Sequence, residues 1–264
     1  FRPIPGEMAL TRAPGLTRIA SPSPFGVLAR GSAGPPRVTT RGDFFVPGAR
    51  EIRIAFLVDG YNLYYSLRDA SERLGLVGAG TRWLDVRAFC QSYLPAIDKR
   101  AMAVGFHYFT AIAHHLDTPH EQATVRHRHY LECLHDRGVT VHLGHFKERW
   151  HVCPTCETRF MRHEEKETDV AMGSKLLELF SRDECDGAVL VSGDSDIAPA
   201  VRAATRLFPT KRVYSCFPYR RRSALLGTIV RKAFRVSLQR YGRFQLPDPV
   251  VLTSGLRIRR PAGW

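Results

Sequence analysis

Three aspartates follow two strand-like segments of the sequence. Asp59 comes directly after the apolar run 52–58, and Asp194 and Asp196 come shortly after the apolar run 187–191. Both runs are too short for helices and too continuous for exposed strands, so we predict that each forms a buried parallel strand. Reactive groups collect at the carboxyl ends of parallel strands, and two neighbouring strands of this kind would bring Asp59 within reach of Asp194.

A fourth carboxylate, Asp169, is predicted near the N-terminus of a helix, where the helix dipole tolerates an acidic group. Carboxylates that share a pocket repel one another, and binding a divalent cation relieves that repulsion most simply. Hard carboxylate oxygens suit Mg²⁺ or Mn²⁺. Taken singly, Asp59 is also typical of a turn and Asp196 of a helix cap, so the prediction depends on the whole set.

Strand-like and helix-like segments alternate through the rest of the chain. We predict strands at 52–58, 101–111, 139–143, 187–191 and 212–217, and helices within 63–74, 84–93, 119–137, 165–180, 197–205 and 223–234. This alternation indicates an α/β fold in which helices cover both faces of a central, mostly parallel sheet. The stretch 144–163, rich in Cys and His, is predicted to be a small insertion.

Three segments resemble the signature blocks of NYN domains, in the order that family has, and most closely those of its LabA-like branch. They are Val-Asp-Gly-Tyr-Asn at 58–62, Glu-Lys-Glu-Thr-Asp-Val at 165–170 and Leu-Val-Ser-Gly-Asp-Ser-Asp at 190–196. Gln-Leu-Pro-Asp at 245–248 is similar to that branch as well, so the resemblance spans about residues 52–250. It implies a PIN-like, three-layer α/β/α nuclease fold that hydrolyses RNA with one or two Mg²⁺ or Mn²⁺ ions.

Carried over block by block, the resemblance gives the catalytic and metal-binding roles to Asp59, Asp169, Asp194 and Asp196, the same four that the strand ends indicate. The ions would polarise the phosphoryl oxygen, lower the pKa of the attacking water and shield the leaving oxygen. We therefore expect a metal-dependent ribonuclease. One alternative is a catalytically weak RNA-binding or regulatory module of the same fold. Another is a phosphatase, although the first block lacks the Asp-x-Asp of aspartyl-phosphate enzymes.

Several polar residues are candidates for substrate binding. Asn62 either orients the first carboxylate, touches a phosphate or caps a helix, and Ser192 is predicted in a tight turn that lets backbone N–H groups approach a phosphate. Arg220, Arg221 and Arg222 follow a strand end, where they suit contacts with the backbone of single-stranded RNA, and Tyr219 is available to stack on a base. The alternative for the arginines is a solvated surface.

Cys153 and Cys156 form a Cys-x₂-Cys pair with an intervening proline, a spacing typical of a structural zinc knuckle. A closed zinc site needs four ligands, so the others must come from nearby histidines, another part of the fold or a second chain. A redox dithiol is the competing interpretation. In the LabA-like branch a similar pair precedes the acidic helix, which favours the structural role.

The net charge of +14 is concentrated at the two ends of the 264-residue chain. Residues 1–50 carry +5 and residues 220–264 carry +10, so the middle is nearly neutral, as expected of an acidic site flanked by surfaces for a polyanion. We predict a disordered basic arm at 1–50, a nuclease domain at 51–250 and a basic tail at 251–264. A targeting segment or an extended reading frame is also consistent with the arm.

The six cysteines do not form a disulfide framework, and no run of 18 apolar residues occurs. We therefore expect a protein without membrane spans in a reducing compartment, with the cytoplasm as the predicted location. The oligomeric state stays open, with a homo-oligomer among the alternatives.

Overall fold

A computed structural model of the chain describes residues 50–76, 80–117, 123–262 and 264. The predicted basic arm therefore lies outside the described residues, apart from Arg50. The described residues belong to one compact unit of the chain, Gly48–Trp264.

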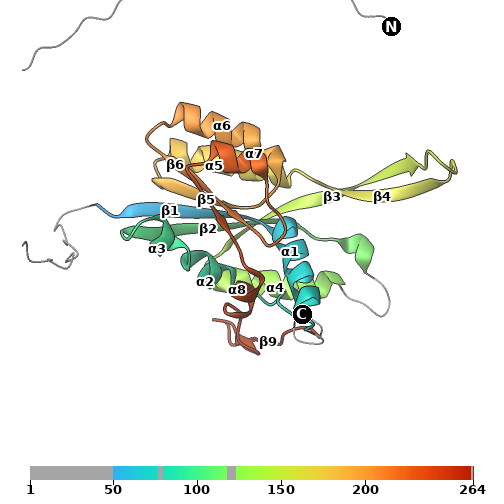
Figure 1. The fold of residues 1–264 in the computed structure, drawn as a ribbon. Helices are drawn as coiled ribbons and strands as arrows, with labels where there is room; N and C mark the ends of the chain where they lie inside the picture. Colours follow the sequence, from blue (N-terminus) through green and yellow to red (C-terminus); the bar gives the residue numbers. More distant parts are fainter. Residues whose placement is uncertain (1–49, 77–79, 118–122, 263) are drawn as a thin grey trace, which may run out of the picture. The chain divides into compact units, whose positions relative to one another are not determined.

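The centre of this unit is a seven-stranded sheet with the strand order β4-β3-β2-β1-β5-β6-β7 (Figure 1). Its strands are β1 (Ile52–Asp59), β2 (Ala101–Ala111), β3 (Thr140–Val152), β4 (Arg159–Lys166), β5 (Gly187–Val191), β6 (Arg212–Phe217) and β7 (Lys232–Arg235). All neighbours are parallel except β3 and β4. The predicted α/β fold with a mostly parallel central sheet is confirmed.

Helices cover both faces of this sheet (Figure 1). The main ones are α1 (Gly60–Arg73), α2 (Val86–Gln91), α3 (Leu94–Ile97), α4 (Ala123–Asp136), α5 (Thr168–Ser181), α6 (Ala198–Leu207), α7 (Ala224–Ile229) and α8 (Leu238–Gly242). Two short turns, η1 (His114–Leu116) and η2 (Ser195–Ile197), and the small pair of strands β8 (Val250–Val251) and β9 (Arg257–Ile258) complete the described elements.

Side chains of β1 alternate between two hydrophobic cores. Ile54, Phe56 and Val58 join the core beneath α1, α2, α4 and α8, whereas Ala55 and Leu57 join the core beneath α5, α6 and α7. All five are completely buried. A strand covered on both faces has no solvent-exposed side to place polar residues on, which explains the uninterrupted apolar run.

The stretch 144–163 is not a compact insertion, because it continues the sheet as a long hairpin. Backbone pairing of β3 with β4 runs from His145 opposite Lys166 to Val152 opposite Arg159, and Figure 1 shows the two strands extending beyond the other strands of the sheet. The helix expected from residue 165 therefore begins only at Thr168. This part of the prediction was wrong because the helical spacing of apolar residues starts at Val170, after the strand has ended.

A second correction concerns the predicted helix 223–234. Helix α7 ends at Ile229, and the chain then forms β7 parallel to β6, with Phe234 opposite Cys216. Phe234 packs against the core while Lys232, Ala233 and Arg235 are exposed, so backbone pairing with β6, and not a run of apolar residues, defines this strand. No helix in the described part of the chain is long and apolar enough to cross a membrane.

An ion pair aligns β1 with β5 at the end of the sheet opposite to the aspartates. The Arg53 side chain donates from Nε and Nη2 to the two oxygens of Asp186 at 3.2 and 2.9 Å, and the backbone N–H of Arg53 donates to the same carboxylate at 2.9 Å. The Asp186 backbone N–H donates to the carbonyl of Arg53 at 2.8 Å. These contacts fix the register of β1 against β5.

We expect Asp186→Asn to lower the free energy of unfolding at pH 7 by about 1–2 kcal/mol, because charged hydrogen bonds become neutral ones. Hydrogen bonds from Arg53 hold the pKa of Asp186 down at about 2. The contribution of the ionised carboxylate is therefore complete above the unfolded pKa of about 4 and is lost as the pH falls toward the folded value. Urea unfolding should show the difference between wild type and variant closing over this range, and a constant difference would contradict the assignment.

Candidate active site

The predicted neighbourhood of the two acid-bearing strands is confirmed. β1 and β5 are parallel partners, with Val58 opposite Val191, so Asp59 and Ser192 follow at adjacent positions. The Ser192 hydroxyl donates to Asp59 Oδ2 at 2.9 Å and accepts from the Asp194 N–H at 3.0 Å. One buried serine thus joins the first carboxylate to the turn that carries the second.

Asp59 is almost completely buried, with 6% of its surface exposed. Its Oδ1 accepts the backbone N–H of Asn62 at 2.9 Å, which makes Asp59 the N-cap of α1. Burial raises the pKa of Asp59 to about 6 against these hydrogen bonds, and the negative charges of Asp169 and Asp194 raise it further. Asp59 is therefore a helix cap, where the alternative considered from the sequence was a turn residue, and the same side chain lines a cleft with other acids.

The four predicted aspartates line one cleft of about 650 Å³, here called the acidic cleft. Its lining contains the acids Asp59, Glu165, Glu167, Asp169, Asp194 and Asp196, together with Tyr61, Asn62, Tyr65, Lys166, Thr168, Val170 and Arg221. These residues come from four separate parts of the chain: β1 with α1, β4 with α5, the turn after β5, and the loop after β6. The fold therefore gathers acids that are far apart in sequence.

Glu165 is an acid of this cleft that the sequence reasoning did not single out. Burial raises the pKa of Glu165 to about 7, with added repulsion from Asp59 and Asp169, while the Thr168 hydroxyl donates to it and opposes that rise. It was missed because residue 165 was expected on a helix. The signal lies in strand pairing, since Glu165 is opposite Phe146, whose ring packs on Tyr61 at the cleft.

Asp169 lies in the first turn of α5, as predicted, and burial raises its pKa, followed by the negative charges of Asp194 and Asp196. Asp194 caps the short turn η2, because its Oδ1 accepts the N–H of Asp196 at 3.0 Å. The cap at this turn is thus Asp194, and the alternative role of Asp196 as a cap is not observed.

Gly193 brings the turn after β5 into direct contact with the loop after β6. A Cβ on this residue would lie 1.5 Å from the carbonyl oxygen of Arg221, so no other residue fits without moving the loop. The Gly193 N–H donates to Asn62 Oδ1 at 3.0 Å. Asn62 therefore links α1 to the turn through its side chain, while its backbone N–H, and not its side-chain amide, contacts Asp59.

The structure separates the residues predicted to bind RNA. Arg221 lines the acidic cleft, where its Nη2 donates to Asp69 at 2.9 Å and its guanidinium lies 6.0 Å from the centre of the Tyr65 ring. Arg220 and Arg222 are exposed and lie outside the cleft lining. Tyr219 packs against the hydrophobic core, and its N–H donates to the Tyr241 hydroxyl at 3.1 Å, so its ring lies outside the cleft lining as well.

Cys153 and Cys156 lie at the turn of the β3–β4 hairpin, and both are free thiols. The Cys156 thiol donates to the Thr158 hydroxyl at 3.3 Å. The nearest histidine in sequence, His151, forms a hydrogen bond of 3.1 Å with Glu164 across the hairpin. No third Cys, His, Asp or Glu within the described ranges joins the two thiols, so these residues do not form the predicted zinc site by themselves.

The carboxylates of the acidic cleft fit a hard cation by type and charge, since burial and mutual repulsion raise the pKa of Asp59, Glu165 and Asp169. Their present arrangement is more open than a closed ion site. Across the part of the chain that is described, no three acid, Cys or His side chains converge enough to enclose a metal ion. A bound cation would have to draw these side chains together.

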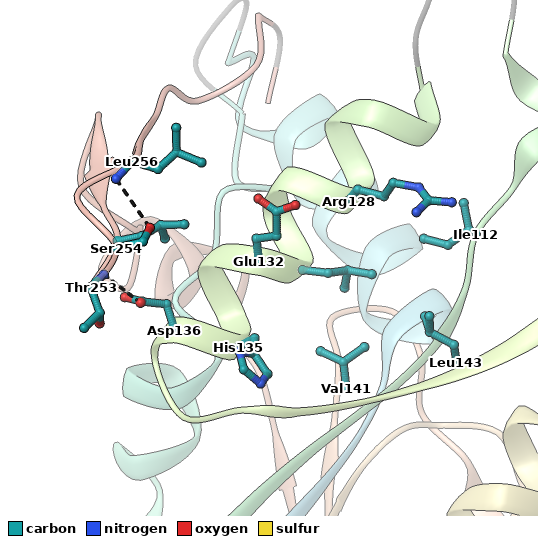
Figure 2. A pocket seen from close by; sticks show the side chains of 12 residues that line it. Ile112, Arg128, Glu132, His135, Asp136, Val141, Leu143, Thr253, Ser254 and Leu256 are labelled. Atoms are coloured by element: carbon teal, nitrogen blue, oxygen red, sulfur yellow. Dashed lines mark hydrogen bonds between the residues drawn. The ribbon is translucent and has the colours of Figure 1, made fainter.

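A separate pocket of about 720 Å³ lies between α4, β3 and residues 252–256 (Figure 2). Figure 2 shows Glu132, His135 and Asp136 along α4, with Asp136 accepting the backbone N–H of Thr253 at 2.8 Å. None of the strand-end acids lines this pocket. The acidic cleft is therefore the candidate active site.

Helices on both faces of a mostly parallel sheet, with acids gathered at its carboxyl edge, define a PIN-like α/β fold of the kind found in nucleases. The family model described as "NYN domain" matches residues 53–224, and the chain belongs to the NYN domain family. Members of that family are generally nucleases. The LabA-like branch stays a prediction.

A solved structure of a protein of unknown function from Vibrio parahaemolyticus RIMD 2210633 is similar to this chain. The two share 19% sequence identity with a TM-score of 0.46, over 74% of this chain and 97% of the other. No curated protein matches this sequence.

We expect Asp169→Asn to raise the melting temperature at pH 8 in the presence of EDTA. An acid whose pKa is raised in the folded state lowers stability once it ionises, and this cost is absent below its unfolded pKa of about 3.9. The gain should therefore be small near that pH and grow as the pH rises through the folded pKa, as scanning calorimetry at several pH values can measure.

Asp98→Asn is a matched control, because hydrogen bonds from Arg100 lower the pKa of Asp98. This exchange removes a favourable contact and should not raise the melting temperature at pH 8. If Asp169→Asn also failed to raise the melting temperature at pH 8, ionised Asp169 would not destabilise the folded protein and the assignment would be wrong.

Proposed function

We propose that this chain is a metal-dependent ribonuclease that hydrolyses RNA phosphodiester bonds in the acidic cleft. The observation that carries the proposal is the crowding of Asp59, Glu165 and Asp169 in one cleft, where burial and mutual repulsion raise all three pKa values. A fold has little reason to concentrate such unfavourable charge unless a cation or a reaction uses it. Membership of the NYN family supports nuclease chemistry for this cleft.

In this proposal Asp59, Asp169, Asp194 and Asp196 hold Mg²⁺ or Mn²⁺. When bound, the ion would polarise the phosphoryl oxygen and lower the pKa of the attacking water. Ser192 and the N–H of Asn62 orient the Asp59 carboxylate by hydrogen bonds at 2.9 Å, so that it is already placed before any ion arrives. Asp59 therefore needs little rearrangement, whereas the other carboxylates would have to move toward it to enclose the ion.

Two further residues have roles in the proposed reaction. Glu165, with a pKa of about 7, is suited to accept a proton near neutral pH, as a general base must. Arg221 lines the same cleft and is suited to contact an RNA phosphate. The tyrosines Tyr61 and Tyr65, which also line it, favour single-stranded RNA, whose unpaired bases can stack on aromatic rings.

The second candidate is a catalytically weak RNA-binding or regulatory module of the same fold. The observation in its favour is the open arrangement of the acids, of which no three within the described residues converge on one point. Cleavage assays separate the two candidate functions.

The six free cysteines support a reducing compartment, such as the cytoplasm, for either candidate.

We expect Asp194→Asn to reduce the cleavage rate of single-stranded RNA more than about 100-fold in Mg²⁺ or Mn²⁺, beyond the effect typical of residues that only orient a metal ligand. RNA binding in EDTA should change little, because the variant keeps the fold and loses only a negative charge. The rate is measured on end-labelled RNA, and EDTA should stop the wild-type reaction.

Asp248→Asn is the control, since Asp248 lies outside the acidic cleft and accepts the N–H of Arg260 at 3.0 Å. Its rate should equal that of the wild type. Equal rates for all three proteins would point to a contaminating nuclease, and binding without any cleavage would favour the RNA-binding module.

We expect replacement of both Arg220 and Arg222 by Gln to flatten the salt dependence of RNA binding. Each lost phosphate contact should reduce the slope of log K against log salt by about 0.7 for a single strand. Replacing the exposed Arg257 of β9 by Gln is the matched control and should leave the slope unchanged. An unchanged slope in the double variant would show that these arginines form a solvated surface.

A further inference from the structure

A small aromatic cavity adjoins the acidic cleft. It encloses about 170 Å³ between α1, the end of β2 and α4, and Tyr61 and Tyr65 line both this cavity and the cleft. Its other aromatic walls are Tyr64, Tyr108, Tyr130 and Trp264. Tyr61 and Tyr65 therefore form a shared wall between the acidic cleft and the aromatic cavity.

The size of the aromatic cavity limits what can enter it. Sites for whole small molecules usually measure about 300–1,000 Å³, so a space of about 170 Å³ suits a single flat ring system and excludes a complete nucleotide. A strand of RNA that placed a phosphate over the acids would have its next base only one sugar away. Because Tyr61 and Tyr65 line both the cavity and the cleft, one strand can place a phosphate in the cleft and a neighbouring base in the cavity.

The hydroxyl groups of two of the cavity's tyrosines are bound to backbone carbonyls of the protein. The Tyr61 hydroxyl donates to the carbonyl of Ala111 at 2.9 Å, and the Tyr130 hydroxyl donates to the carbonyl of Leu84 at 2.8 Å. With these polar atoms used inside the protein, the rings offer faces and edges to a ligand. Every nucleobase has a π-face that stacks on such rings.

Positive and neutral polar groups complete the walls. Arg82 and Arg126 line the cavity, and the Arg82 guanidinium lies 5.9 Å from the centre of the Trp264 ring. His127 also lines it, and burial lowers the pKa of His127 to about 4, so its imidazole is neutral at pH 7. A neutral imidazole provides one hydrogen-bond donor and one acceptor, as the edge of a base requires.

We propose that the aromatic cavity receives one base of the RNA strand, next to the phosphodiester bond that lies over the acidic cleft. This inference rests on the proposed function and adds to it a base-binding subsite made by α1 and α4. The base stacks on the tyrosines, and His127 with the arginines contacts its edge. The strand must therefore unpair at this position, which restricts the substrate to single-stranded or looped RNA.

Abasic replacement along the substrate tests this subsite directly. The substrate is a short single-stranded RNA whose cleaved bond has been mapped, and its bases are removed one position at a time. Binding to the full chain is measured in EDTA, so that no cleavage occurs. We expect a loss of affinity of about 5- to 150-fold at one position beside the cleaved bond, the range for one base stacked on an aromatic side chain, and much smaller losses elsewhere.

A double-mutant cycle then assigns that base to the cavity. Tyr64 lines the cavity but not the acidic cleft, so Tyr64→Leu should weaken binding of the intact RNA by a similar factor. Removing the sensitive base should then cause no further loss in this variant. Tyr64→Phe keeps the ring and should bind like the wild type, and melting temperatures show whether each variant is folded.

His127→Ala is a second, independent variant and should also weaken binding of the intact RNA. His129→Ala is its control and should bind like the wild type, since His129 is exposed on the same helix and lies outside the cavity lining. Equal losses at all abasic positions, or an abasic effect that persists in Tyr64→Leu, would overturn the base subsite. Cleavage without a sensitive position would remove the subsite and leave the proposed ribonuclease intact. If the protein cleaves no RNA, the same abasic scan is made on an uncleaved single strand, and a sensitive position there would contradict the ribonuclease while keeping a base-binding cavity.

Discussion

Negative charge that has been taken out of water at the carboxyl edge of the sheet is the constraint on which the rest of the site depends. Asp59 is held there by the parallel pairing of β1 with β5, and its burial is tolerated because Ser192 and the start of α1 donate hydrogen bonds to it. Those contacts only partly offset desolvation, since the pKa of Asp59 remains raised. The negative charge of the cleft is therefore not neutralised by these contacts and attracts positive charge.

The positive charge nearest to the acids is arranged so that it does not fill the cleft. Arg221 is bound by Asp69, which lies outside the cleft lining, and Lys166 lies 3.0 Å from Glu164 rather than from a cleft acid. A chain with a net charge of +14 therefore retains an acidic cleft at the carboxyl edge of its sheet. In the proposed reaction, a substrate phosphate near Arg221 and a metal ion at the acids would occupy neighbouring positions without neutralising each other.

The strands that carry the aspartates were predictable because local sequence decides them. An apolar run bounded by an acid leaves a buried parallel strand as the simplest structure, and β5 and β6 have the bounds expected from sequence. Glu165 was not predictable in the same way, because its place depends on pairing with Phe146. Tyr219 was expected to be available for stacking on a base, but its ring packs against the hydrophobic core beside Tyr241. Such long-range packing has no signature within a short window.

The close contact between Gly193 and the carbonyl of Arg221 limits how the loop after β6 can vary. Backbone atoms have no rotamers, so the turn that holds Asp194 and the loop that holds Arg221 meet at a separation set by the chain itself. Exchange of side chains elsewhere in the loop can change which groups are presented, but not how far the loop stands from the acids. Sequence variation in this loop can therefore change the side chains that face the cleft while the distance between the two backbone segments is preserved.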